Sequence, residues 1–179
     1  MLSEEQKRDL VRRARAAVEA QVTGRPIATA AAADLPKASG AFVTIKHQGR
    51  LRGCLGTLEC RRGLGDEVVR CAADAASEDP RFPPVTAEEL PDVALEVSVL
   101  GPLERIDPLQ EGAFEIGRHG LVVEQGLHRG LLLPQVATEW SWTPEQFLRQ
   151  TCVKAGLPPD AWQHGATVYR FAAEVFGER

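Results

Sequence analysis

Hydrophobic residues near the N-terminus recur at helical spacing, at Leu10, Val11, Ala14, Val18 and Val22. Ser3 and Gln6 form a capping box in front of this run, and Gly24 ends it. The pattern predicts an amphipathic helix between Ser3 and Gly24. The alanine-rich segment that follows, residues 26–36, breaks the period, and both a short helix and a connector remain open there.

Period-two alternation then takes over. Residues 41–47, AFVTIKH, are β-branched and aromatic, Gln48-Gly49 offers a turn, and residues 50–59 return as a second strand. Residues 93–100, VALEVSVL, alternate with Glu96 and Ser98 on the polar face. Residues 120–135 predict a second hairpin, and residues 166–176 predict a last strand.

Further helices separate these strands. Residues 64–76 place Val68, Cys71, Ala72 and Ala75 on one helical face. A proline-rich loop, residues 77–91, holds one helical turn capped by Thr86. Thr143 opens a helix that ends at Gly156. The order of elements predicts an α+β protein with a mainly antiparallel sheet flanked by helices.

The two predicted hairpins share a sequence. Residues 48–55 align without gaps on residues 125–132, with Gln, Gly, Arg, Gly and Leu at the same offsets. Two explanations remain open: hairpins reuse Gly and Arg, or the chain holds two repeats, near residues 38–80 and 115–157. In a duplication, Leu131 stands where Cys54 stands in the first copy.

Composition limits the classes of function. The chain has 179 residues, 44% of them hydrophobic, which suits a single domain over residues 1–179. A formal charge of −4 argues against nucleic acid as a partner. The charged N-terminus and the lack of a long apolar run predict a cytoplasmic protein without a membrane segment. Four irregularly spaced cysteines predict free thiols.

The strongest chemical signal is Cys54, within LRGCLG. A thiolate is a nucleophile, and a nearby cation increases its population at neutral pH. Arg52 lies two residues before Cys54 on the predicted strand, so that both side chains share one face. Arginine cannot accept the thiol proton, so we expect Glu96 or His119 to act as the base. Cys54, His119 and Glu96 are therefore the predicted catalytic residues.

The predicted substrate-binding residues are Arg52, Gly53, Gly56 and Ser98. The two glycines would let backbone N–H groups approach an anion closely. Structural explanations stay open for each residue. Cys54 would be a packed core thiol, the glycines a bulge or bend, Arg52 with Glu96 an ion pair, and His119 a satisfied turn residue. The spacing does not require a metal site at Cys54, His119 and Glu96; no metal is predicted, and any cofactor is unknown.

Several separated motifs, in order, resemble the AMMECR-type domain family along nearly the whole chain. They are GAFVTIK, LRGCLG, DPRFPPVTAEELP, EVSVL, GRHGLVVEQGLHRGLLLPQVA, FLRQTCVKAGLP and VYRF. The family core reads L-R-G-C-I-G, and Leu55 replaces its isoleucine. The second half is especially similar to protein A of the bacterial AmmeMemoRadiSam system.

The resemblance implies two β-rich repeats with helices that share one curved or barrel-like, mainly antiparallel sheet. It implies a Memo-like protein and a radical SAM enzyme as partners, and it supplies no established reaction. Together with the residues, it predicts a small cytosolic enzyme that uses Cys54 as a nucleophile or redox thiol on a small molecule or peptide. The alternative is a non-catalytic protein that presents a ligand to those partners or docks on them.

Overall fold

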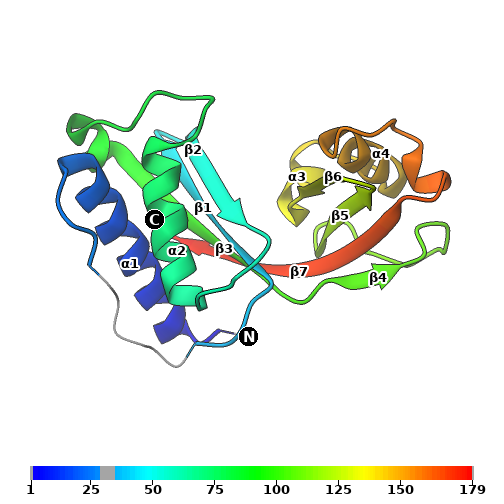
Figure 1. The fold of residues 1–179 in the computed structure, drawn as a ribbon, viewed down its shortest axis with the longest axis horizontal. Coiled ribbons are helices and arrows are strands. Elements are labelled where there is room, and N and C mark those ends of the chain that lie inside the picture. Colours follow the sequence, from blue (N-terminus) through cyan, green and yellow to red (C-terminus); the bar gives the residue numbers. More distant parts are fainter. Residues whose placement is uncertain (1, 29–34, 179) are drawn as a thin grey trace. The chain divides into compact units, whose positions relative to one another are not determined.

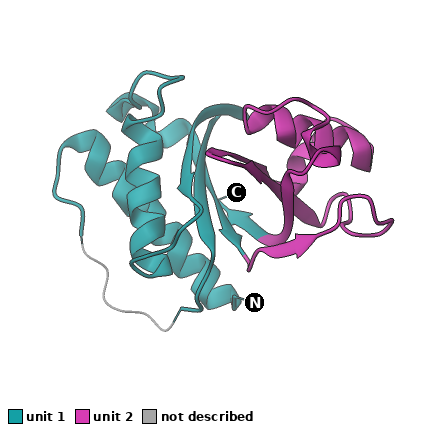
Figure 2. Ribbon diagram, turned by 45° about the vertical axis from the view of Figure 1, so that its right-hand side comes forward, with its two compact units in different colours: residues 1–100, 174–179 teal, residues 101–173 magenta. Residues whose placement is uncertain are grey.

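The computed structural model describes residues 2–28 and 35–178, so residues 29–34 of the predicted short helix or connector lie outside the described residues. The chain divides into two compact units, residues 1–100 with 174–179, and residues 101–173 (Figure 2). Each unit combines antiparallel strands with helices of its own. The α+β class and the antiparallel pairing are therefore confirmed.

In the first unit two helices cover one face of the sheet (Figure 1). Strand β1 pairs antiparallel with β2 on one side and with β3 on the other, and the end of β7 lies beside β3. Strand β2 is the edge of this sheet. The elements are α1 (Glu4–Thr23), β1 (Gly40–His47), β2 (Arg50–Thr57), α2 (Leu64–Ser77), the 3₁₀ helix η1 (Ala87–Asp92), β3 (Val93–Leu100) and part of β7 (Thr167–Gly177).

Helix α1 confirms the first predicted helix. Ser3 and Gln6 form the expected capping box, and Gly24 closes the helix in a left-handed conformation with φ 70°. The buried residues of α1 are Leu10, Ala14, Ala17 and Val18, and they pack with α2 and the sheet into one core. No helix in the described parts of the chain combines the length and apolar character needed to cross a membrane.

The first hairpin contains a bulge beside Gly53, where the sequence left a bulge or bend open as the structural explanation. Gln48 and Gly49 both have positive φ, as a two-residue hairpin turn of type I′ requires. Ile45 pairs with Gly53 whereas Lys46 pairs with Leu51, so Arg52 is an extra residue in β2. This β-bulge interrupts the strict alternation from which Arg52 and Cys54 were expected to share a face.

The second unit repeats the sequence of a hairpin followed by a helix. Strand β7 runs between β5 and the short strand β4, and β6 forms the other edge. Phe147, Leu148 and Trp162 pack with residues of β5 and β7 into the core of this unit. The elements are β4 (Glu104–Ile106), β5 (His119–Gln125), β6 (His128–Leu132), α3 (Pro134–Glu139), α4 (Pro144–Lys154), η2 (Ala161–Gln163) and β7. The sequence pattern missed β4 and α3.

A glycine on the second strand of each hairpin allows a helix to approach the sheet. A Cβ on Gly53 would clash with the backbone carbonyl of Ala75 in α2. A Cβ on Gly130 would clash with the backbone at Ala155, just after α4. These are the two glycines that the internal alignment superimposes, and both pair with a residue of the first hairpin strand. A common origin of the two hairpins stays a prediction.

Candidate functional site

Cys54 lies in a polar row that crosses three neighbouring strands of the first unit. Thr44 on β1 is in register with Cys54 on β2 and with Glu96 on β3. The residues on either side of Thr44 along β1, Val43 and Ile45, are fully buried in the core. Because side chains alternate along a strand, the row lies on the sheet face opposite α1 and α2. A thiol, a hydroxyl and a carboxylate therefore stand side by side.

The thiol is half-buried and hydrogen-bonded. Its Sγ lies 3.3 Å from Oγ1 of Thr44, a contact in which either atom serves as donor. Burial raises the pKa of the Cys54 thiol above its ordinary value, while the Thr44 hydrogen bond and the charge of Arg81 act to lower it. The carboxylates of Asp79 and Glu96 raise it further. The net effect is a thiol that stays protonated at neutral pH.

Asp79 connects Cys54 to the loop after α2. Cys54 lies on an edge strand, and its N–H donates to Oδ2 of Asp79 at 3.0 Å. The same carboxylate accepts the backbone N–H of Arg81 and two bonds from its guanidinium, at 3.0 Å and 2.8 Å. The Asp79 side chain is only 3% exposed. These bonds hold the pKa of Asp79 well below its usual range.

Arg52 also binds the segment after α2. Its guanidinium forms a bidentate pair with Glu89, at 2.8 Å and 3.1 Å, and donates to the carbonyls of Pro83 and Pro84. The pair lowers the pKa of Glu89 to about 2. The expected alternative of an Arg52–Glu96 ion pair is wrong, because Glu96 pairs with Lys46 at 3.6 Å instead. The cation that acts on the Cys54 thiol is Arg81.

The chain itself fills the space at both predicted substrate-binding glycines. Helix α2 occupies the position above Gly53, and a Cβ on Gly56 would clash with the ring of Phe42 and the carbonyl of Ala41. Since the N–H of Cys54 binds Asp79, it is not directed at a ligand. Packing therefore accounts for both glycines, and their binding role stays a prediction.

Ser98 lies two residues after Glu96 on β3 and is in register with Phe42. It is fully buried, and its Oγ has no hydrogen-bond partner among the described residues. A buried hydroxyl without a hydrogen-bond partner lowers the stability of the folded protein, because it loses its hydrogen bonds to water. The substrate-binding role of Ser98 stays a prediction.

His119 belongs to the second unit, at the start of β5. It is buried, and its Nδ1 accepts the backbone N–H of Glu115 at 3.0 Å. Burial, together with the charges of Arg170 and Arg118, lowers the pKa of His119, which keeps the imidazole neutral at pH 7. Cys54 and His119 belong to different units, and their pairing as nucleophile and base stays a prediction.

The corresponding row in the second unit has different chemistry. Gly130 pairs with Val123 as Gly53 pairs with Ile45, so the next register position places Leu131 opposite Val122. Val122 is also in register with Tyr169 on β7. The second hairpin, which pairs without a bulge, therefore has Leu131 and Val122 where the first has Cys54 and Thr44. The thiol and hydroxyl are not a requirement of the fold.

The remaining cysteines are also free thiols, as the sequence predicted. Cys71 and Cys152 are buried and Cys60 is half-buried. Burial raises the pKa of all three, that of Cys71 to about 12. Within the described residues, no three His, Cys, Asp or Glu side chains gather as ligands for a metal ion. Cavities of about 500 Å³ and 670 Å³ in this unit are lined mainly by α1 rather than by the row at Cys54.

Sequence reasoning missed four residues at this site: Thr44, Lys46, Asp79 and Arg81. Thr44 and Lys46 lay within a strand that was recognised only as a strand. Asp79 and Arg81 lay in the DPRFPP segment, whose signal was the pairing of an acidic and a basic residue with prolines in a loop. Nothing local to that segment indicates that it returns to Cys54.

Comparison with known proteins identifies the relatives of this chain. The family model described as AMMECR1 matches residues 11–176. A protein of Methanothermobacter thermautotrophicus is 46% identical over 186 residues, covering 99% of this chain and 96% of that protein. A protein of Thermococcus onnurineus is 48% identical over 181 residues, covering 94% of this chain and 88% of that protein.

A solved structure has the same fold. The crystal structure of the uncharacterized protein PH0010 from Pyrococcus horikoshii is similar to this chain with a TM-score of 0.87 and 42% sequence identity. The match covers 99% of this chain and 94% of that one. The likeness extends over both compact units.

Proposed function

The chain belongs to the AMMECR1 family, and we propose that it is an enzyme in which the thiol of Cys54 attacks an electrophilic substrate. The observation that carries this proposal is the row formed by Cys54, Thr44 and Glu96. A protonated thiol needs a base to become a nucleophile, and the row offers a carboxylate one strand further with a hydroxyl between the two groups. The apolar side chains of Leu131 and Val122, at the positions in the second unit that match Cys54 and Thr44, add support.

The raised pKa of Cys54 makes a base necessary at the moment of attack. In the proposed step, the Cys54 sulfur forms a bond to an electrophilic carbon, and the leaving group departs with the electron pair of the bond that breaks. The thiol proton moves to the hydroxyl of Thr44, whose own proton moves to the carboxylate of Glu96. Glu96 is partly exposed, so it can release the proton to water.

We place this reaction in the cytoplasm, where free thiols persist. The resemblance of the second half to protein A of the AmmeMemoRadiSam system supports a Memo-like protein and a radical SAM enzyme as partners. The substrate in this proposal is a small molecule or a peptide that reaches the sheet face at Cys54.

The pH-dependent rate of alkylation by iodoacetamide tests the role of Glu96. As a fixed negative charge, Glu96 only raises the pKa of Cys54, and Glu96→Gln would then speed up alkylation at pH 7. As the proton acceptor, it promotes reaction of the neutral thiol, and Glu96→Gln slows alkylation severalfold. Peptide mapping follows each cysteine separately, with half-buried Cys60 as the internal control.

A slower reaction at Cys54 in the Glu96→Gln variant, with Cys60 unchanged, supports the proposal. A faster reaction, or a wild-type Cys54 that is modified no faster than Cys60 between pH 7 and pH 10, rejects it. The variant Glu88→Gln, at an exposed glutamate in η1, is the matched control.

A second candidate function is a non-catalytic docking or ligand-presenting protein. The raised pKa of Cys54 favours it, because a protonated, half-buried thiol also suits packing. This alternative predicts that Cys54→Ser leaves the copurification of a Memo-like protein and a radical SAM enzyme unchanged. The proposed enzyme differs in that Cys54→Ser also abolishes the reaction at this residue, whereas docking requires no reaction there.

A further inference from the structure

We propose that Arg81 binds a carboxylate group of the substrate that Cys54 attacks. This inference rests on the proposed function, and it names both a substrate class and a residue that selects it. The relevant loop, residues 79–84, follows α2 and returns to the edge of β2. Sequence separation hides this contact, since Asp79 stands 25 residues from Cys54.

One oxygen atom fixes Arg81 beside Cys54. Oδ2 of Asp79 accepts both the Cys54 N–H, at 3.0 Å, and an N–H of Arg81 Nη2, at 2.8 Å. The backbone nitrogen of Cys54 and Nη2 of Arg81 are therefore no more than about 6 Å apart, because each lies about 3 Å from Oδ2 of Asp79. The position does not depend on a flexible arginine alone, since Asp79 is buried and also holds the Arg81 backbone.

The guanidinium keeps donors for a ligand. Asp79 engages Nε and Nη2, and Nη1 has no hydrogen-bond partner among the described residues. The Arg81 side chain is 53% exposed, and its guanidinium carbon lies 5.4 Å from the centre of the Phe82 ring. A guanidinium fixed on one edge by a buried carboxylate and packed near a ring presents its other N–H groups in a defined direction.

The opposing charges near Cys54 are already paired. Asp79 accepts four hydrogen bonds, and Glu96 forms an ion pair with Lys46 at 3.6 Å. The charge of Arg81 acts on the Cys54 sulfur directly and lowers the pKa of the thiol. An anionic group bound to Nη1 would therefore hold the rest of a substrate next to the nucleophile.

Iodoacetate and iodoacetamide test this inference, because the two reagents deliver the same electrophilic carbon with and without a carboxylate. Rate constants are measured at Cys54 and at Cys60 in the same molecule. We expect the iodoacetate-to-iodoacetamide ratio at Cys54 to exceed that at Cys60 by about fivefold. We expect Arg81→Gln to reduce it to the Cys60 value or below, since Asp79 and Glu96 then repel the reagent.

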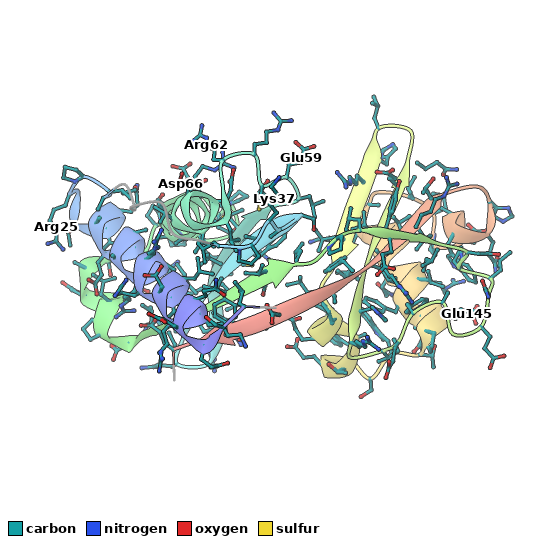
Figure 3. The ribbon with its side chains drawn as sticks, turned by 90° about the horizontal axis from the view of Figure 1, so that it is seen from below. Arg25, Lys37, Glu59, Arg62, Asp66 and Glu145 are labelled. Carbon is teal, nitrogen blue, oxygen red and sulfur yellow. The ribbon has the colours of Figure 1, made fainter. Side chains whose placement is uncertain are left out.

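The ratio separates charge selection from exposure, because a loosened loop would change both rates together. Arg25→Gln is the matched control: Arg25 is an exposed arginine just after α1 (Figure 3). Its substitution should leave the ratio at Cys54 unchanged. A wild-type ratio equal to that of Cys60, or a ratio that Arg81→Gln does not change, overturns the inference.

The two proposals fail separately. Iodoacetamide is neutral, so its rates in the Glu96→Gln variant test the proposed function whatever Arg81 does. If neither reagent modifies Cys54, the proposed function fails, and acetate binding tests Arg81 on its own. A saturable shift of the Arg81 Nε–H resonance on titration with acetate, at constant ionic strength, supports the anion site. The absence of such a shift overturns it.

Discussion

The carboxylate of Asp79 accepts the backbone N–H of Cys54 at 3.0 Å, across 25 residues of sequence. An edge strand exposes N–H groups that have no partner in the sheet, and Asp79 satisfies the one at Cys54. The same carboxylate binds Arg81. One buried group thus completes the edge of β2 and positions a cation beside the thiol.

Protonation of Asp79 at acid pH should lower the free energy of unfolding. Its pKa in the folded state is lower than in the unfolded chain, where an aspartate has a pKa of about 3.9. The stabilisation is therefore fully present above about pH 5 and is lost as the pH falls through 4 toward 2. We expect Asp79→Asn to lower the free energy of unfolding by about 1–3 kcal/mol at pH 7.

Urea unfolding between pH 2.5 and pH 7 measures this effect. The difference between wild type and Asp79→Asn should narrow as the pH falls below about 4. Glu88→Gln, at an exposed carboxylate, should follow the wild-type curve. A constant difference across the range would show that Asp79 contributes through packing and not through its charge.

Gly53 is required by the approach of α2. A Cβ would meet the backbone carbonyl of Ala75, which cannot move without displacing the helix. We expect Gly53→Ala to lower the free energy of unfolding by about 2–3 kcal/mol, as measured by urea denaturation.

Gly65→Ala is the control for this substitution. Gly65 lies within α2, and an added Cβ there first meets the flexible end of the Arg13 side chain. Alanine also favours the helix, so the change should be within about 1 kcal/mol. Equal losses in the two variants would contradict the proposed close contact at Gly53.

Arg52 anchors the loop after α2 through geometry that lysine cannot reproduce. It binds Glu89 through two nitrogens and also reaches the carbonyls of Pro83 and Pro84. We expect Arg52→Lys to destabilise the protein by about 1–2 kcal/mol and to increase hydrogen exchange in residues 81–89.

Arg50→Lys provides the comparison, because Arg50 is an exposed residue on the same strand. Hydrogen exchange in residues 81–89 should not change in that variant. If Arg52→Lys leaves exchange in the loop unaltered, the bidentate pair does not hold the loop in solution.

Thr44 tunes the reactivity of Cys54. Its hydrogen bond lowers the pKa of the thiol against the larger effect of burial. We expect Thr44→Val to shift the alkylation profile of Cys54 to higher pH and to slow the reaction at pH 8 severalfold, measured with iodoacetamide.

Thr57→Val is the matched substitution on β2, since the Thr57 hydroxyl binds the carbonyl of Glu59 instead. It should leave the Cys54 profile unchanged. An unshifted profile in Thr44→Val would mean that the 3.3 Å contact has no effect on ionisation.

The sequence by itself determined the elements whose signals are local. The capping box at Ser3, the alternation over residues 93–100 and the turn at Gln48-Gly49 each depend on neighbours a few residues apart. Residues 93–100 were predicted to the residue because period-two alternation and burial coincide there. Cys54, Glu96 and Ser98 were likewise singled out from sequence, and the structure places them on one sheet.

Only the tertiary structure decided which groups surround the thiol. Arg52 was the expected cation because strict alternation would put it beside Cys54, but the bulge at Arg52 interrupts the alternation. Arg52 instead forms an ion pair with Glu89. Asp79, in the loop after α2, binds both the Cys54 N–H and Arg81, and so holds Arg81 near Cys54. The register of β2 and the packing of the Asp79 loop against it are set by contacts between residues far apart in sequence. No local sequence pattern encodes those contacts.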